Sequence, residues 1–282
     1  MSYLNANGIR LSYEMKGEGF PVIFIHGFGS KKDIWQPQIL TLSKKFKTIT
    51  FDLRGAGMSE RPNSPYTMEV FADDVKGLMD SLHIKLTHLI GRSLGGMIAQ
   101  RFVLKYPNYV KKLVLIATSS KFDQKRAIDS IINNRIQEIE LLRTDPEKAF
   151  WNKAYFVFHQ KFRSKLKSNP KKLYYNSFSL ETLIKDSQIN PSRPQDIINQ
   201  GNAMKDHNTF DELPQINNST LLLAASHDRL IIKSSMDIIH KRIPNSTLKI
   251  IQNAGHFMTL SKAPEVNKLI LEFLENMLEV DS

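Results

Sequence analysis

Residues 88–100 have the sequence HLIGRSLGGMIAQ, a short apolar run that leads into a glycine-flanked serine and then continues with a helical pattern. The segment Gly91–Gly95 matches the G-x-S-x-G nucleophile elbow, in which a serine stands on a tight turn between a strand and a helix. Glycines two residues before and after that serine let the strand and the helix pass without a Cβ clash. The pattern makes Ser93 a candidate nucleophile. An ordinary Gly/Ser turn is the alternative until the context decides.

The sequence around this elbow alternates between strand and helix patterns. Short apolar or alternating runs predict strands at the elbow and over 9–15, 22–25, 47–53, 110–117, 220–225 and 248–251. Helical periodicity is found between these runs, including an amphipathic helix from Thr67 to Leu82 whose polar face holds Asp73, Asp74, Lys76 and Asp80. The last helix carries apolar positions from Val266 to Met277. Alternating strands and helices predict an α/β fold with a mostly parallel sheet.

The alternation stops between about Ser120 and Leu213. Isoleucines at helical spacing over 128–139 predict one helix, and Asp145 followed by Pro146 is typical of the start of another. We therefore expect a core domain formed by residues 1–120 and 213–282, and an all-helical insertion over residues 121–212 that lies across the sheet.

Composition excludes several classes of protein. The 282 residues are 41% hydrophobic and 24% charged, as expected of a soluble globular protein rather than a disordered or membrane protein. The first residues lack the basic and apolar segments of a secretory signal, so a cytoplasmic location is expected. The net charge of +11 is not accompanied by a nucleic-acid-binding module, and the chain has no cysteine. Covalent catalysis would therefore need a nucleophile other than a thiol.

Two further residues complete a catalytic constellation with Ser93. A serine hydroxyl needs a histidine base, and the histidine needs an acid that orients it. Asp228 follows the strand over 220–225, and His256 follows the strand over 248–251. Both lie at the carboxyl ends of parallel strands, where open sheets bind ligands. The order Ser93, Asp228, His256 is also the order that accompanies a G-x-S-x-G elbow in a hydrolase sheet.

Acyl transfer also needs backbone N–H groups directed at the developing oxyanion. Leu94 follows the nucleophile and supplies one such donor. Phe28, in the segment His26–Gly29 at the end of another strand, is placed to supply the second. His26 itself is expected to brace this loop rather than to transfer protons.

These segments together resemble the α/β-hydrolase superfamily, and the amino-terminal half is similar to 3-oxoadipate enol-lactonases and related small esterases. The resemblance is carried by VIFIHG at 22–27, DLRGAGMS at 52–59, GRSLGGM at 91–97 and NAGH at 253–256. It implies an eight-stranded, mostly parallel sheet with helices on both faces and a helical cap. It also implies hydrolysis of small carboxylic esters or lactones through an acyl-enzyme, with no cofactor.

Arg92 departs from this resemblance, because such enzymes more often carry His, Leu or Asn before the nucleophile. Two interpretations are open: Arg92 pairs with a carboxylate as part of the structure, or it contacts an anionic group of the substrate. In the insertion, Trp151, Tyr155, Phe156 and Phe158 are expected to form mainly the cap's own core, with one or two of them facing the pocket. Trp151 is our candidate substrate contact. The eight histidines show no metal-ligand spacing, so no metal site is expected.

The same triad supports other chemistry. A C–C bond hydrolase, an acyltransferase or a perhydrolase would use it with a different substrate or a nucleophile other than water. A small-molecule receptor on this fold would keep the pocket without turnover.

Overall fold

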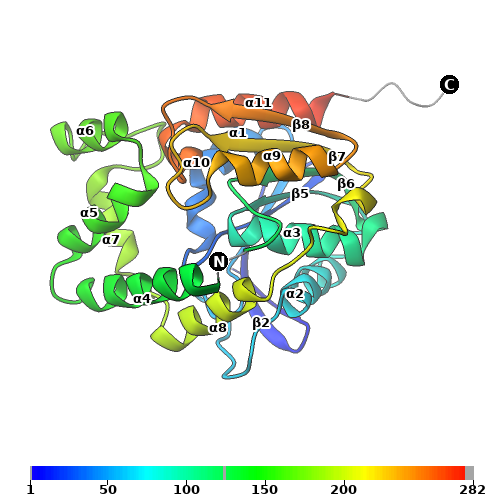
Figure 1. Ribbon diagram of the computed structural model, residues 1–282, viewed down its shortest axis with the longest axis horizontal. Coiled ribbons are helices and arrows are strands. Elements are labelled where there is room, and N and C mark those ends of the chain that lie inside the picture. The colour runs from blue at the N-terminus through cyan, green and yellow to red at the C-terminus, as the bar shows by residue number, and fades with distance from the viewer. Residues whose placement is uncertain (1, 123–124, 277–282) are drawn as a thin grey trace.

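The computed structural model describes residues 2–122 and 125–276, and one eight-stranded sheet forms its centre (Figure 1). The strand order is β1-β2-β4-β3-β5-β6-β7-β8. The pairs β1–β2 and β2–β4 are antiparallel, and all other neighbours are parallel. The strands are β1 (Ser2–Ala6), β2 (Ile9–Lys16), β3 (Pro21–Ile25), β4 (Lys47–Phe51), β5 (Thr87–Arg92), β6 (Val110–Ile116), β7 (Ser219–Ala225) and β8 (Ser246–Ile251). The predicted α/β fold is thus confirmed.

Helices cover both faces of the sheet because successive strand residues point to opposite sides. Ile23, Leu89 and Leu113 pack on the face covered by α2 (Met68–Ser81), α3 (Leu94–Lys105) and α9 (Lys233–Arg242). Their neighbours Val22, Ile90 and Val114 pack on the opposite face, which is covered by α1 (Gln36–Leu42), α10 (Met258–Ser261) and α11 (Ala263–Glu275). Short 3-10 turns lie at Lys32–Trp35, Pro107–Tyr109 and Leu213–Gln215. These two layers fix the carboxyl ends of the parallel strands along one edge.

In the described part of the chain five helices lie between β6 and β7, and they occupy the left and lower part of Figure 1. They are α4 (Lys125–Leu141), α5 (Pro146–Val157), α6 (Gln160–Ser168), α7 (Leu180–Ser187) and α8 (Pro194–Lys205). Asp145 begins α5 as expected, because its carboxylate accepts a hydrogen bond of 2.9 Å from the Lys148 N–H. A separate aromatic cluster with Phe150, Phe158 and Phe162 holds α5 and α6 together. The division at residues 121 and 212 stays a prediction.

Hydrogen bonds tie this helical insertion to the loop after β3. The Gly29 N–H donates to Gln200 Oε1 of α8 at 3.0 Å, and Arg135 Nη2 of α4 donates to the Gly29 carbonyl at 2.5 Å. Lys31 Nζ also donates to the carbonyls of Asp186 and Ile189, at 2.9 and 2.7 Å. The insertion therefore bonds directly to the loop that carries Phe28.

Details of several predicted elements change in the structure. The strand at residues 2–6 was not predicted, because this segment is short and mostly exposed and is recognised by its pairing with β2. β4 ends at Phe51 rather than at residue 53, and the loop after this strand begins at Asp52. Met277 lies outside the described residues.

Asp74 was wrongly placed on the solvent face of α2. Its carboxylate is fully buried and receives two hydrogen bonds of 2.6 Å, from Arg54 Nε and Nη2. Arg54 lies in the loop after β4, so the partner that explains a buried acid on this helix is twenty residues away in the chain. Helical periodicity contains no information about such a partner.

Candidate active site

Ser93 stands on the strained turn that the elbow motif predicts. It lies between β5 and α3 with φ 55° and ψ −120°, a conformation that L-residues rarely adopt. Its N–H donates to the Ile116 carbonyl at 2.9 Å, and Thr118 Oγ1 donates to its carbonyl at 2.8 Å. A Cβ on Gly91 would lie 2.2 Å from the Gly95 carbonyl oxygen, and a Cβ on Gly95 would lie 2.1 Å from that of Ile25. The two glycines are therefore required by close packing of the backbone.

His256 and Asp228 meet at the edge of the sheet. Asp228 follows β7 and His256 follows β8, and His256 Nδ1 lies 2.8 Å from Asp228 Oδ2. The other Asp228 oxygen accepts hydrogen bonds of 2.9 Å from the N–H groups of Leu230 and Ile231. Because the carboxylate accepts, Nδ1 carries the proton, and Nε2 is left as the basic nitrogen. His256 and Ser93 line the same cavity.

Two backbone donors flank this arrangement. Leu94 is the first residue of α3, and Phe28 lies in the loop after β3. Within the described residues, neither N–H has a hydrogen-bond partner. The Leu94 N–H also belongs to a helix N-terminus, where unsatisfied N–H groups and the helix dipole favour negative charge. Phe28 lines the same cavity as Ser93, and the role of the two N–H groups at an oxyanion stays a prediction.

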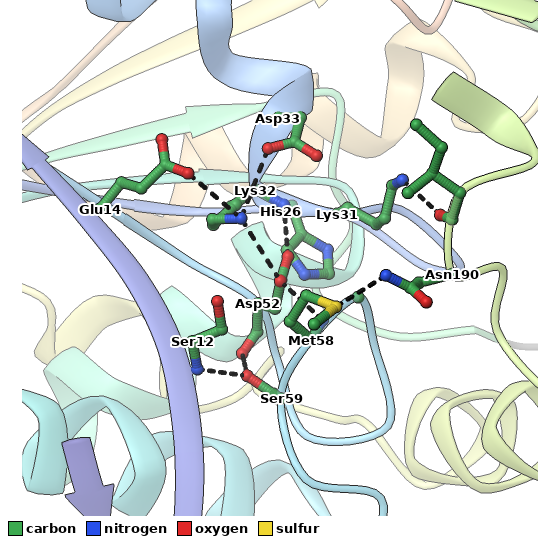
Figure 2. A network of polar contacts seen from close by, with 12 residues as sticks. Ser12, Glu14, His26, Lys31, Lys32, Asp33, Asp52, Met58, Ser59 and Asn190 are labelled. Atoms are coloured by element: carbon green, nitrogen blue, oxygen red, sulfur yellow. Dashed lines mark hydrogen bonds and ion pairs between the residues drawn. The ribbon is translucent and has the colours of Figure 1, made fainter. Parts of the chain in front are cut away.

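The loop after β3 is held by the polar network in Figure 2. His26 Nδ1 donates to the Gly27 carbonyl at 2.9 Å, and the Leu53 N–H donates to Nε2 at 3.0 Å. Both ring nitrogens are thereby used, and burial lowers the pKa of His26. Asp52 accepts from the N–H groups of Lys32 at 2.8 Å and Met58 at 3.0 Å. His26 acts as a neutral brace for the loop that presents Phe28.

The cavity above Ser93 has a volume of about 1270 Å³ and is lined largely by residues of the helical insertion. Trp151, Tyr155 and Phe156 all line it, whereas Phe158 packs in the aromatic cluster of the insertion. More of these aromatic side chains therefore face the cavity than the one or two that the sequence suggested. Trp151 Nε1 donates to Glu147 Oε1 one turn earlier at 3.3 Å, which fixes its ring at the wall.

Arg92 makes no ion pair within the residues that the structure describes. Its side chain is 1% exposed, and its guanidinium carbon lies 4.1 Å from the centre of the Phe257 ring. Nε and Nη1 are buried without a hydrogen-bond partner. Burial lowers the pKa of Arg92 to about 10, and the nearby Asp228 carboxylate partly opposes this shift. Arg92 thus remains a cation at neutral pH, and it does not form the structural carboxylate pair considered from the sequence.

A second charged group in the cavity was missed by the sequence analysis. Lys153 of α5 and Arg135 of α4 both pair with Glu138, with Lys153 Nζ 3.4 Å from Glu138 Oε1. All three residues line the cavity. A signal was present in the sequence, because Lys153 falls at helical spacing from Phe150 and Val157, on the apolar face of α5.

The described part of the chain contains no group of three or more His, Asp or Glu residues that could hold a metal ion. Nor does any helix within it have the length and apolar content needed to cross a membrane.

Comparison with known proteins supports the fold and identifies the family. The chain is 29% identical to a putative non-heme chloroperoxidase from Synechocystis sp., over 96% of this chain and 97% of that protein. An esterase from Thermogutta terrifontis superposes with a TM-score of 0.81 at 26% identity, covering 97% of this chain and 98% of that one. The enol-lactonase from Burkholderia xenovorans LB400 has a TM-score of 0.81 at 22% identity, covering 98% and 100%. The model of the alpha/beta hydrolase fold matches residues 21–263, and the chain therefore belongs to this family of hydrolases.

Proposed function

We propose that this hydrolase cleaves small carboxylic esters or lactones through an acyl-enzyme on Ser93. The observation that carries the proposal is the His256–Asp228 hydrogen bond beside an elbow serine that shares its cavity with His256. The backbone N–H groups of Phe28 and Leu94, which have no partner among the described residues, would supply what acyl transfer needs besides a base. The esterase from T. terrifontis supports ester chemistry through its similarity in both sequence and fold.

The reaction follows from the roles that these groups can take. His256 Nε2 accepts the proton of the Ser93 hydroxyl as Oγ attacks the carbonyl carbon. The N–H groups of Phe28 and Leu94 donate to the resulting oxyanion, and Asp228 stabilises the imidazolium. His256 then protonates the leaving alcohol oxygen. In the second half of the cycle it activates water, which releases the acid and regenerates Ser93.

In this proposal residues 121–212 act as a cap that selects the substrate. The cap supplies much of the cavity wall, including Trp151, Tyr155 and Phe156. Trp151 is the proposed apolar contact with the substrate, and Arg92 is the proposed contact with an anionic group. The T. terrifontis esterase structure has malate bound, and this supports an anionic substrate group.

A fluorophosphonate probe tests the proposal directly. We expect intact-mass spectrometry to show one covalent adduct, which Ser93→Ala abolishes together with the hydrolysis of short p-nitrophenyl esters. Absence of the adduct, or unchanged hydrolysis by Ser93→Ala, would refute the proposal. An adduct without turnover of any ester, lactone or vinylogous diketone would favour a receptor. Turnover of diketones alone would favour a C–C hydrolase.

Perhydrolysis is a second candidate, favoured by the similarity to the putative chloroperoxidase. It would use the same acyl-enzyme, with hydrogen peroxide in place of water, and the released product would be a peracid. Adding peroxide to the ester assay and measuring peracid distinguishes the two functions. Peracid formation faster than hydrolysis would identify perhydrolysis as the main activity.

A further inference from the structure

The cavity wall includes a cation, Arg92, that forms no ion pair with any residue that the structure describes. Arg92 is buried, and two of its guanidinium nitrogens have no hydrogen-bond partner among those residues. Asp228 is near enough to stabilise the charge on Arg92, but its carboxylate already bonds to His256 and to two backbone N–H groups. An unpaired buried charge is costly, and such groups are retained mainly where they serve a ligand or the chemistry.

Lys153 faces the same region from the helical insertion. Its Nζ lies 5.6 Å from the centre of the Phe257 ring, against which Arg92 also packs. Arg92 is close enough to Lys153 to help lower its pKa. The acid beside Lys153 is Glu138, which it shares with Arg135. One carboxylate therefore serves two cations, and Arg92 adds a third positive charge nearby.

The charges that line the cavity are mostly positive. Among the described lining residues, seven are lysine or arginine and one, Glu138, is acidic. Phe28, Ile131 and Met204 add apolar side chains to the lining. In such surroundings an ion pair is screened less than in water, so a ligand carboxylate would gain more from Arg92 here than at the surface.

The position of Arg92 limits how far a bound anion can be from the reacting atoms. A Cβ placed on Gly27 would lie 3.2 Å from Arg92 Nη2 and also 3.2 Å from Ser93 Cβ. Arg92 Nη2 and Ser93 Cβ are thus separated by no more than twice that distance. A carboxylate that bonds to Arg92 can therefore be only a few bonds from the carbonyl that Ser93 attacks.

We propose that Arg92 and Lys153 form a carboxylate subsite, and that the preferred substrates are monoesters of short dicarboxylic acids. The acyl group of the ester remains on Ser93 after the alcohol leaves. A cation next to Ser93 can therefore hold a carboxylate throughout the reaction only if that carboxylate belongs to the acyl group. This assignment rests on the proposed ester or lactone hydrolysis and specifies its substrate class.

Binding to a variant that cannot turn over tests the subsite without relying on activity. In Ser93→Ala, calorimetry should show that succinate binds, while butyrate binds at least about tenfold more weakly. Adding Arg92→Met should weaken succinate binding by about 10–100-fold. Adding Lys153→Met should weaken it by a smaller factor. Lys148→Met is the matched control, because Lys148 lies on the same helix and lines the same cavity but is exposed. This change should alter succinate binding by less than about twofold.

Hydrolysis separates the subsite from the proposed function. The substrates are p-nitrophenyl hemisuccinate and p-nitrophenyl isocaproate, in which an isopropyl group replaces the carboxylate. Arg92→Met should raise KM for the hemisuccinate and leave the isocaproate nearly unchanged. Equal losses on both esters would refute the subsite and leave the esterase proposal intact. Loss of fluorophosphonate labelling in the wild-type protein would refute the esterase proposal, while succinate binding would still decide the subsite. Inorganic phosphate binding as tightly as succinate would overturn the assignment to carboxylates.

Discussion

Replacing Arg92 by methionine should stabilise the protein, although Arg92 is among its largest fully buried side chains. A pKa lowered from 12.5 to about 10 corresponds to about 3 kcal/mol of unfavourable free energy for keeping the cation buried at neutral pH. The cost is fully present below the folded pKa and disappears as pH rises toward the unfolded value. Methionine keeps most of the apolar stem but loses the stacking on Phe257, which is worth up to about 2 kcal/mol. The difference is a gain of about 1–2 kcal/mol.

The assay is thermal and urea unfolding at pH 7, with circular dichroism and fluorescence as independent probes. A gain of this size should raise Tm by about 2–5 °C. Succinate should raise the Tm of the wild-type protein by more than it raises that of Arg92→Met at the same concentration, because a weaker ligand of the folded state shifts the unfolding equilibrium less. A loss of more than about 2 kcal/mol would refute the reasoning, since it would show that the guanidinium makes bonds that support the fold. Substitutions at a binding site commonly increase the stability of the fold while they reduce function.

Three further predictions test the site and the fold. Asp228→Asn should lower kcat for p-nitrophenyl esters by about 10³–10⁴-fold with little change in Tm, because it removes the orientation of His256; a loss below tenfold would contradict this role. Burial and then the charge on Arg135 lower the pKa of Lys153 to about 8, and the charge on Glu138 opposes this shift. KM for the hemisuccinate should therefore rise above pH 8, where Lys153 loses its positive charge. KM for the isocaproate, and KM for the hemisuccinate with Lys153→Met, should show no such rise. Asp74→Ala leaves Arg54 buried and unpaired and should cost about 3–5 kcal/mol in urea unfolding, and a cost near zero would show that the pair contributes little.

The local parts of the fold were readable from residue types and their spacing. Apolar runs located most of the sheet, and the glycines around Ser93 predicted the turn, because only a residue without a Cβ fits against a neighbouring backbone at those points. The short segment at 2–6, which is mostly exposed, gave no such signal, because its strand is defined by pairing with β2. Asp228 and His256 each follow a parallel strand, and such strands end at one edge of a sheet. The sequence therefore predicted that these two side chains lie close together, as their hydrogen bond shows.

The sequence by itself determined the α/β fold and the residues that belong together at the strand ends, because strand and helix periodicity and glycine sterics act over a few residues. The tertiary structure alone decided what surrounds each charge. It showed that Asp74 is paired with Arg54, that Glu138 is shared by Lys153 and Arg135, and that Arg92 forms no ion pair within the described part of the chain. The electrostatic environment of a side chain is set by groups distant in the chain, and the packing of the helical insertion on the sheet brings them together.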